Sequence, residues 1–413
     1  MNKRIVVTGM GAVTPLGNSV DSYWEALISG KSGIDMIKEF DASSLDTRFA
    51  GEVKGFKPED FLPKKLIKNT ERFSQLAYAA ASAAILDAGL VIEPERTGIT
   101  LGTAIAGIRP IADTQEMIAL CPDSKIGPRF VPKLLGNIAA SNIAIYNHIY
   151  GPSITISTAC ASGGDAIKTA CMMLCSGETD TMVTVGAESA ACALMIRGLT
   201  SVSALSKNND NASSASRPFD KARDGLVVGE GGGALILETE EHALRRNARI
   251  IAEIKGCASN NDAYHPMAPH PEGLGAQSCM KKALMAAGLS AEDIGYINAH
   301  GTATLKGDVV EIHAINEVFG KASPSVSSTK GATGHMMGAG GITEIITCVK
   351  AIESGILPPT INLDHIDPEC LGPDLIPKYA KKQNIDYAMS NAFGFGGQNS
   401  TVVVGRYRYD SSF

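Results

Sequence analysis

The sequence Ser153-Ile-Thr-Ile-Ser-Thr-Ala-Cys160-Ala-Ser-Gly-Gly164 changes character at its single cysteine. β-Branched residues precede Cys160 and predict a strand, whereas the alanine- and methionine-rich residues 165–176 predict a helix. A cysteine at this junction lies where the free N–H groups of a helix N-terminus point, and the helix dipole favours its thiolate. We therefore predict that Cys160 is a nucleophile. The alternative is that it is one of nine cysteines used as small apolar core residues.

The second half of the chain repeats this pattern. Val326-Ser-Ser-Thr329 leads into a glycine-rich turn and a helix ending in Glu-Ser-Gly355, just as the strand before Cys160 leads into a helix ending in Cys-Ser-Gly177. Strands and helices alternate in both halves, so we predict a duplicated α/β fold with two mixed sheets packed among helices. We expect the halves to span residues 1–249 and 250–413, joined by a charged helix over 238–249.

The composition is that of a globular protein with a large core. The chain has 413 residues, of which 44% are hydrophobic, and its net charge of −6 provides no basic field for nucleic acid or a membrane surface. Nine cysteines without paired Cys-x-x-Cys spacing argue against disulfides and structural zinc, and favour the cytoplasm. Residues 76–92 look apolar, but their many alanines, Asp87 and Gly89 indicate a packed helix rather than a membrane span.

Two histidines follow predicted strands of the second half. His300 lies in Asn298-Ala-His300-Gly-Thr-Ala-Thr304, and His335 ends Lys330-Gly-Ala-Thr-Gly-His335. Open α/β sheets place reactive groups in loops at strand ends, so we predict that both histidines belong to one site, although a lone histidine of this kind is more often structural. We expect Lys330 to pair with Glu344 and hold the His335 loop. The alternative is a surface ion pair of little energetic value.

A further glycine-rich turn, Asn391-Ala-Phe-Gly-Phe-Gly-Gly397, carries two aromatic residues. Glycine permits positive φ and close approach of the backbone. A substrate gate or an oxyanion-hole donor requires both properties, so we predict that this turn belongs to the site.

Two other polar groupings are less decisive. The densest positive cluster contains Lys64, Lys65, Lys68 and Arg72. Such a cluster is usually a solvated face, and the alternative is a docking site for an acidic partner. His265 and His270 lie close together, but no carboxylate or cysteine obviously completes a metal site, so we expect a structural loop and no bound metal.

Four of these motifs together resemble one family. Thr-Ala-Cys160-Ala-Ser-Gly, Asn-Ala-His300-Gly-Thr, Lys330-x-x-Thr-Gly-His335 and Gly-Phe395-Gly-Gly, in this order and spacing, are similar to the elongating β-ketoacyl-acyl-carrier-protein synthases of type II fatty acid synthesis. The resemblance covers essentially the whole chain. It implies a thiolase-like fold with α-β-α-β-α layers, a homodimer, acyl carrier protein as the partner, and no cofactor beyond the carrier's phosphopantetheine.

The resemblance also implies a role for each site residue. Cys160 would hold the acyl chain as a thioester, and His300 and His335, with Lys330 nearby, would stabilise the enolate left when malonyl carrier loses carbon dioxide. Condensation would give a 3-oxoacyl carrier. The implied supporting residues are the backbones of Cys160 and Phe395 as oxyanion hole, Thr302 and Thr304 against phosphopantetheine, Ile105 and Leu199 in the acyl pocket, Phe130 in the partner's pocket, Phe393 and Phe395 as gate, Glu344 as support, and the basic cluster as carrier dock.

Several positions depart from the family pattern and leave alternatives open. Ala303, Leu305, Gly331 and Gln398 replace the residues usual in their motifs, which leaves chain-length preference and carrier identity undetermined. One alternative is a specialised ketosynthase of a polyketide or unusual acyl pathway. A second is a chain-length-determining partner subunit, although such subunits generally lack the nucleophile. A third is thiolase chemistry on acyl-CoA, which uses a second cysteine that residues 391–399 do not contain.

Overall fold

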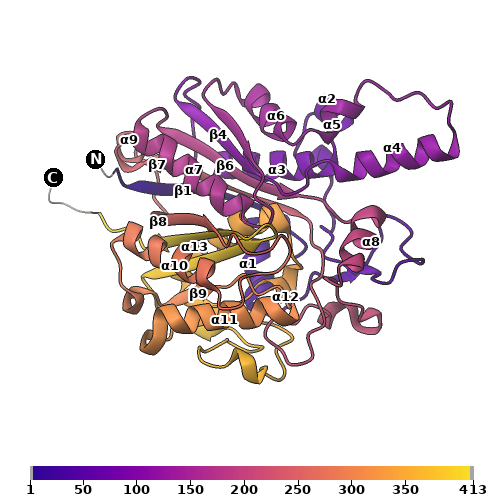
Figure 1. Ribbon diagram of the computed structural model, residues 1–413. Coiled ribbons are helices and arrows are strands. Elements are labelled where there is room, and N and C mark those ends of the chain that lie inside the picture. Colours follow the sequence, from indigo (N-terminus) through magenta and orange to yellow (C-terminus); the bar gives the residue numbers. More distant parts are fainter. Residues whose placement is uncertain (1–2, 410–413) are drawn as a thin grey trace.

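The computed structural model describes residues 3–409, in which ten strands form one continuous sheet (Figure 1). The first five strands, in the order β5-β4-β6-β7-β1, are β1 (Ile5–Val13), β4 (Thr97–Gly102), β5 (Ser153–Ile156), β6 (Thr181–Glu188) and β7 (Gly231–Thr239). The second five, in the order β10-β9-β13-β14-β8, are β8 (Ala252–Asn261), β9 (Tyr296–Asn298), β10 (Ser325–Ser327), β13 (Tyr387–Gly394) and β14 (Gln398–Gly405). Counted within its own half, each set has the same strand order.

Strand directions confirm the duplication. In the first half β4 is parallel to β5 and β6, while β7 is antiparallel to β6 and β1. In the second half β9 is parallel to β10 and β13, while β14 is antiparallel to β13 and β8. The two predicted sheets are joined, because residues 5–7 of β1 pair with residues 252–254 of β8.

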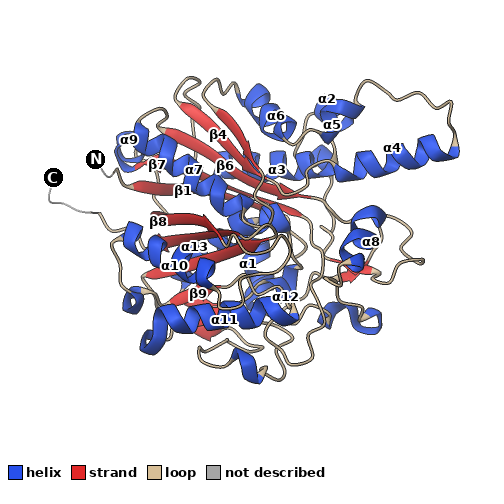
Figure 2. Ribbon diagram, in the orientation of Figure 1, coloured by secondary structure: helices blue, strands red, loops and turns tan. Residues whose placement is uncertain are grey.

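Helices form the layers around and between these halves (Figure 2). The middle layer consists of α7 (Ser162–Ser176) and α13 (Gly340–Ser354), and each contacts strands of both halves. On one outer face α3 (Arg72–Asp87) covers β1, β6 and β7. On the other, α10 (Leu274–Ala287) and α11 (Leu305–Phe319) share a hydrophobic core with the second half. This is the predicted α-β-α-β-α arrangement.

Small residues let the two central helices meet at their N-termini. A Cβ atom added to Gly341 would lie 2.7 Å from the backbone nitrogen of Gly164, and one added to Gly163 would lie 2.9 Å from the carbonyl oxygen of Gly338. Only glycine permits so close an approach of two backbones. The contact brings the loop that enters α7 beside the loop that enters α13, and these loops carry Cys160 and His335.

Some boundaries differ from the predictions. The charged linker helix is only α9 (Glu240–Arg245), because Glu238 belongs to β7 and is buried, where it accepts hydrogen bonds from Thr8, His242 and Arg246.

The remaining helices are α1 (Val20–Ile28), α2 (Lys64–Asn69), α4 (Ile108–Leu120), α5 (Phe130–Leu134), α6 (Asn137–Asn147), α8 (Ala193–Ser201) and α12 (Lys330–Thr333). The remaining strands are the short β2 (Asp35–Met36), β3 (Phe49–Ala50), β11 (Ile356–Leu357) and β12 (Lys381–Lys382).

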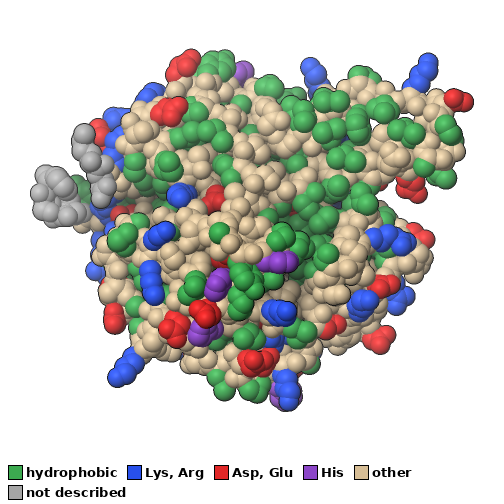
Figure 3. Space-filling view, viewed as in Figure 1, with side chains coloured by type: hydrophobic (Ala, Val, Ile, Leu, Met, Phe, Trp, Pro, Cys, Tyr) green, Lys and Arg blue, Asp and Glu red, His purple; other side chains and the backbone are tan. Residues whose placement is uncertain are grey.

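The segment from α4 to α5 projects from the body as an arm (Figure 1). None of the residues of α4 or α5 is buried, even though many are apolar. The arm therefore exposes four large apolar side chains, Ile111, Leu120, Ile126 and Val131. Figure 3 shows hydrophobic side chains over this arm. Strand β5 lies at an edge of the sheet. No helix within residues 3–409 combines the length and apolar character needed to cross a membrane.

Candidate active site

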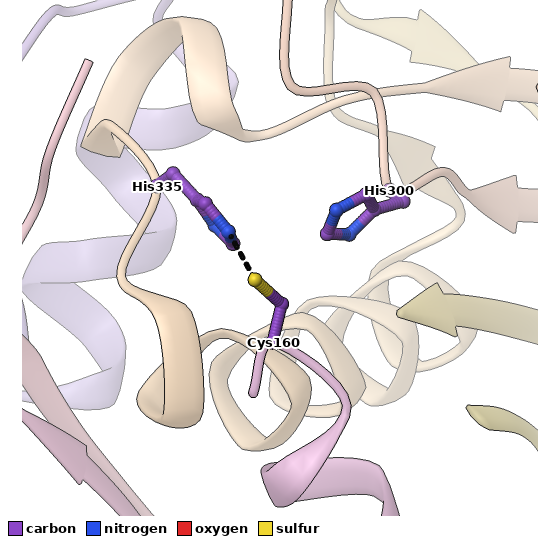
Figure 4. A group of neighbouring side chains, drawn as sticks. All are labelled: Cys160, His300 and His335. Carbon is purple, nitrogen blue, oxygen red and sulfur yellow. Dashed lines mark hydrogen bonds between the residues drawn. The ribbon is translucent and has the colours of Figure 1, made fainter. Parts of the chain in front are cut away.

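Cys160 lies in the tight turn between β5 and α7 (Figure 4). Ala159 before it has a φ of 51°, a left-handed conformation that is strained for a residue with a side chain. The turn is held from both sides, because the Thr158 hydroxyl donates to Asp165 at 2.7 Å and the Thr158 N–H donates to the Ser162 hydroxyl at 2.9 Å. The sulfur is thereby presented on a rigid backbone.

The two predicted histidines meet at this sulfur. His335 Nε2 lies 2.9 Å from Cys160 Sγ, and the His300 ring stands nearly perpendicular to the His335 ring with centroids 5.2 Å apart (Figure 4). His300 follows β9, and His335 follows the single helical turn of α12. Residues from three separate loops therefore converge as the sequence motifs suggested.

Burial and the charge of Lys330 together keep both imidazoles neutral. The Lys330 ammonium forms an ion pair with Glu344, and both side chains are at most 3% exposed. The pair is therefore buried, and the alternative of a surface ion pair of little energetic value is excluded. Burial, reinforced by the Lys330 charge, lowers the pKa of His335 to about 3 and that of His300 well below its usual value. Both rings are neutral, and each has one N–H to donate.

Cys160 does not rest as the thiolate that its place before a helix suggested. Burial raises the pKa of the thiol to about 12, although Lys330 and the backbone N–H of Phe395 both lower it. Loss of hydration outweighs the favourable charges because the half-buried Cys160 faces a cavity lined largely by apolar side chains. In the resting site a neutral thiol therefore donates to a neutral His335, and the proton leaves only when the sulfur reacts.

The predicted turn over 391–397 closes the other side of the sulfur. A Cβ atom on Gly394 would lie 2.9 Å from the Cys160 backbone nitrogen, so the two backbones touch. The Phe395 N–H interacts with the Cys160 sulfur, and its pairing with the Cys160 N–H as an oxyanion hole stays a prediction. The Phe393 ring is 6.0 Å from that of His300, while Phe395 remains 38% exposed at the cavity mouth.

A cavity of about 750 Å³ opens onto Cys160. Ile105, Leu199, Thr302 and Thr304 line it, which is where the family resemblance implied that substrate binds. Phe130 does not line it. This half-exposed residue belongs to α5 on the projecting arm, and its contact with a partner's pocket stays a prediction.

The basic cluster divides into two parts. Lys64, Lys65 and Lys68 are exposed on α2. Arg72 is not part of this surface, because its guanidinium lies 2.6 Å from the buried Glu230 carboxylate and is only 17% exposed. An arginine that neutralises a buried carboxylate cannot leave it without a large energetic cost. The predicted docking role of Arg72 is therefore wrong.

Two buried carboxylates beside the site escaped the sequence analysis. Glu311 accepts the N–H groups of His300 at 2.8 Å and Gly301 at 2.7 Å, and burial raises its pKa to about 7. Glu188 lies at the end of β6 and accepts donors from the loop that carries Ile105. A charged residue that ends an otherwise uncharged strand was the available signal for Glu188.

The donor set also has the composition of a metal site. One ligand atom each from Cys160, His300 and His335 lies within 4.8 Å of the others. With the Cys160 thiol deprotonated, this thiolate and two neutral imidazoles would suit zinc. The Nδ1 atoms of both rings have no hydrogen-bond partner. The expectation that this site binds no metal therefore stays a prediction.

Comparison with known proteins identifies the family of this chain. The model of the β-ketoacyl synthase N-terminal domain matches residues 2–243, and that of the C-terminal domain matches residues 251–364. The chain is 43% identical over 411 residues to 3-oxoacyl-(acyl-carrier-protein) synthase 2 of Vibrio cholerae, covering 98% of this chain and 99% of the relative. A synthase 2 from Synechocystis shows the same identity and coverage.

Solved structures agree with this assignment. The ishigamide ketosynthase/chain length factor is 33% identical with a TM-score of 0.93, covering 99% of this chain and 100% of the other. AntDE:AntF, a type II PKS acyl-carrier protein in complex with its ketosynthase, is 32% identical with a TM-score of 0.90 and the same coverage. The chain therefore belongs to the β-ketoacyl synthase family.

Proposed function

We propose that this protein catalyses decarboxylative condensation of an acyl chain with malonyl-acyl-carrier protein in fatty acid elongation. The products are 3-oxoacyl-carrier protein and carbon dioxide. The convergence of Cys160, His335 and His300 on one apolar cavity is the observation that carries this proposal. The similarity over almost the full length to relatives named 3-oxoacyl-(acyl-carrier-protein) synthase 2 supports the proposal.

The first step is transfer of the acyl group to Cys160. The sulfur attacks the thioester carbonyl of the acyl carrier while the S–H proton passes to His335 Nε2, 2.9 Å away. The carbonyl oxygen takes up negative charge beside the N–H groups of Cys160 and Phe395. The C–S bond to the carrier then breaks, and the carrier thiol leaves with the proton.

The second step generates the carbanion. Malonyl carrier loses carbon dioxide, and the electron pair of the broken C–C bond forms an enolate. Once Cys160 is acylated, its sulfur no longer donates to His335 Nε2, and His335 can take the tautomer with its N–H on Nε2. Neutral His300 and this tautomer of His335 each donate an N–H to the enolate oxygen, and removal of one such donor costs on the order of 10²–10³ in rate. The carbanion attacks the acyl carbonyl, the bond to Cys160 Sγ breaks, and the thiolate takes a proton from water, which replaces the one that left with the first carrier thiol.

Acyl carrier protein is the partner that delivers both substrates, which is why the proposed reaction needs no other cofactor. The phosphopantetheine arm would reach Cys160 past Thr302 and Thr304, which line the cavity. The exposed lysines of α2, Lys64, Lys65 and Lys68, supply positive charge for an acidic carrier surface. The complex of a related ketosynthase with its carrier supports this mode of delivery.

We also propose a homodimer in the cytoplasm. The edge strand β5 and the arm over 108–135 leave apolar side chains uncovered, and contiguous exposed apolar surface marks an interface. A second copy would cover both and bring Phe130 to its partner's cavity. All nine cysteines are free thiols, which supports a reducing compartment.

Intact-protein mass spectrometry tests the proposed reaction. Incubation with acyl carrier should add one acyl mass to the protein, and Cys160→Ala should remove the addition. Wild-type protein that folds but never acylates would overturn the proposal. The chain-length-determining subunit is disfavoured because Cys160 is present with both histidines, and full activity of Cys160→Ala would revive it. Turnover of acetyl-CoA alone would indicate thiolase chemistry instead.

A further inference from the structure

One buried carboxylate connects two loops that line the cavity without itself touching the reacting atoms. Glu188 ends β6, is fully buried, and accepts five hydrogen bonds. No basic side chain pairs with it among the described salt bridges of residues 3–409. All five donors are neutral, four of them backbone N–H groups and one a hydroxyl. They surround the carboxylate as backbone N–H groups surround a bound anion.

Four of the donors belong to the loop that follows β4. The backbone N–H groups of Ala104, Ile105 and Ala106 lie 2.6, 3.3 and 3.1 Å from the carboxylate, and the Thr103 hydroxyl lies 3.1 Å from it. Ala106 has a φ of 54°, which curls successive N–H groups toward one point. The carboxylate holds the loop in this conformation, because three successive N–H groups point at it from residues that are half-buried or buried.

The fifth donor comes from the opposite half of the chain. The Gly338 N–H lies 3.3 Å from Glu188, and a Cβ atom on Gly338 would lie 2.6 Å from Thr103 Cα. Met337, whose φ is 45°, lies between Gly338 and the loop of His335 and lines the cavity, as Ile105 does. The same carboxylate therefore fixes two apolar side chains of the cavity wall.

We propose that Glu188 is a positioning residue for acyl-chain selectivity, because it holds Ile105 and Met337 at their places in the wall of the cavity beside Cys160. The inference rests on the proposed function, since it takes this cavity as the acyl site. Burial raises the pKa of Glu188 to about 7, which shows how weakly solvated the group is and how strongly it depends on its five donors. An apolar residue would fill the same volume but would leave the loop N–H groups unpaired.

Glu188→Gln tests this directly. The amide keeps the shape of the side chain, but one of its two acceptor atoms becomes a donor facing N–H groups, which releases part of the loop. Acylation of Cys160 is measured as kcat/KM for acyl carriers with saturated chains from short to long. Decarboxylation of malonyl carrier is measured alongside, because this step does not require an acyl chain in the cavity. We expect the ratio between the best and the worst chain length to fall about tenfold, with decarboxylation changed less than about twofold.

Two further variants separate positioning from general damage. Glu238→Gln removes a buried carboxylate from the neighbouring strand β7, away from the cavity, and should leave the chain-length profile unchanged. Ile105→Ala should flatten the profile, and its combination with Glu188→Gln should add little, because both act through the same wall. If Glu188→Gln does not fold, Thr103→Val removes one of the five donors and should shift the profile in the same direction by a smaller factor.

The inference and the proposed function fail in different ways. An unchanged chain-length profile in folded Glu188→Gln, or in Thr103→Val where Glu188→Gln does not fold, overturns the role of Glu188 while leaving acylation of Cys160 intact. Strict additivity of the Glu188→Gln and Ile105→Ala effects also overturns it. Absence of acylation in the wild-type protein overturns the proposed function instead.

Discussion

Replacing Lys330 by methionine should destabilise the protein and shift its pH dependence. The ammonium and the Glu344 carboxylate form a buried ion pair in which neither side chain is more than 3% exposed. Lys330→Met leaves Glu344 as a buried charge without a partner, and breaking such a pair typically costs about 3–5 kcal/mol of folding free energy. Lys330→Met/Glu344→Leu removes both charges and should recover most of that loss.

The sign of the pH effect follows from the remaining carboxyl group. Burial already raises the pKa of Glu344 above its usual value, and loss of Lys330 raises this pKa further. When a carboxyl group has a higher pKa in the folded than in the unfolded protein, the free energy of unfolding falls as pH rises and recovers as pH falls. The single variant should therefore be closer to wild type at about pH 5 than at about pH 8, whereas the double variant should show no such difference.

Urea denaturation at the two pH values measures these free energies. A second readout is the pH profile of malonyl decarboxylation. Lys330 helps to lower the pKa of both imidazoles, so both variants should protonate them at higher pH and lose activity earlier on the acidic side. A single variant as unstable as the double at both pH values would refute the assignment of Glu344 as the uncompensated charge.

Four other outcomes are expected. Hydrogen bonds from Arg246, His242 and Thr8 outweigh the effect of burial and lower the pKa of Glu238 to about 2. Its contribution to the free energy of unfolding should therefore be full above about pH 4.5 and vanish as pH falls to about 2. Acid denaturation of Glu238→Gln should lack this pH-dependent loss of stability. Gly394→Ala should reduce acylation by at least about 10²-fold because its Cβ would lie 2.9 Å from Cys160 N, while Gly198→Ala, with open space around it, should leave acylation rates unchanged. Exchange of Lys64, Lys65 and Lys68 for glutamate should raise KM for carrier-bound substrates, and the effect should disappear with acyl-pantetheine and shrink at high salt. Zinc should inhibit acylation reversibly by binding the thiol and two imidazoles, and titration calorimetry should show weaker binding to Cys160→Ser.

The local motifs made much of the site predictable. Strand-to-loop transitions located Cys160, His300 and His335, and the glycine-rich turn located Phe395, because strand ends and turns depend on short stretches of sequence. Glu188 and Glu311 were not found this way. Glu188 accepts backbone N–H groups of a loop more than 80 residues away, and Glu311 accepts those of the loop that precedes its own helix. The spacing of charged residues does not reveal such backbone partners, which become visible only when the loops are placed in the fold.

Arg72 and Cys160 illustrate the same limit for charge. Arg72 belongs to a positive run in the sequence, yet its guanidinium binds Glu230, which is 158 residues away. Cys160 precedes a helix as predicted, yet enclosure by other segments keeps its thiol protonated. Residue spacing does not report burial, and burial decides which charges are available.

The sequence alone determined that this chain has two α/β halves of the same pattern, with a nucleophile in the first half and two histidines in the second. Tertiary structure decided how these parts act together. Close approach of the glycines at the starts of α7 and α13 brings His335 to 2.9 Å from Cys160, and the segments packed around them bury His335 and limit the contact of Cys160 with water. Distances between loops and the loss of hydration arise from packing across the whole fold, so no local stretch of sequence contains them.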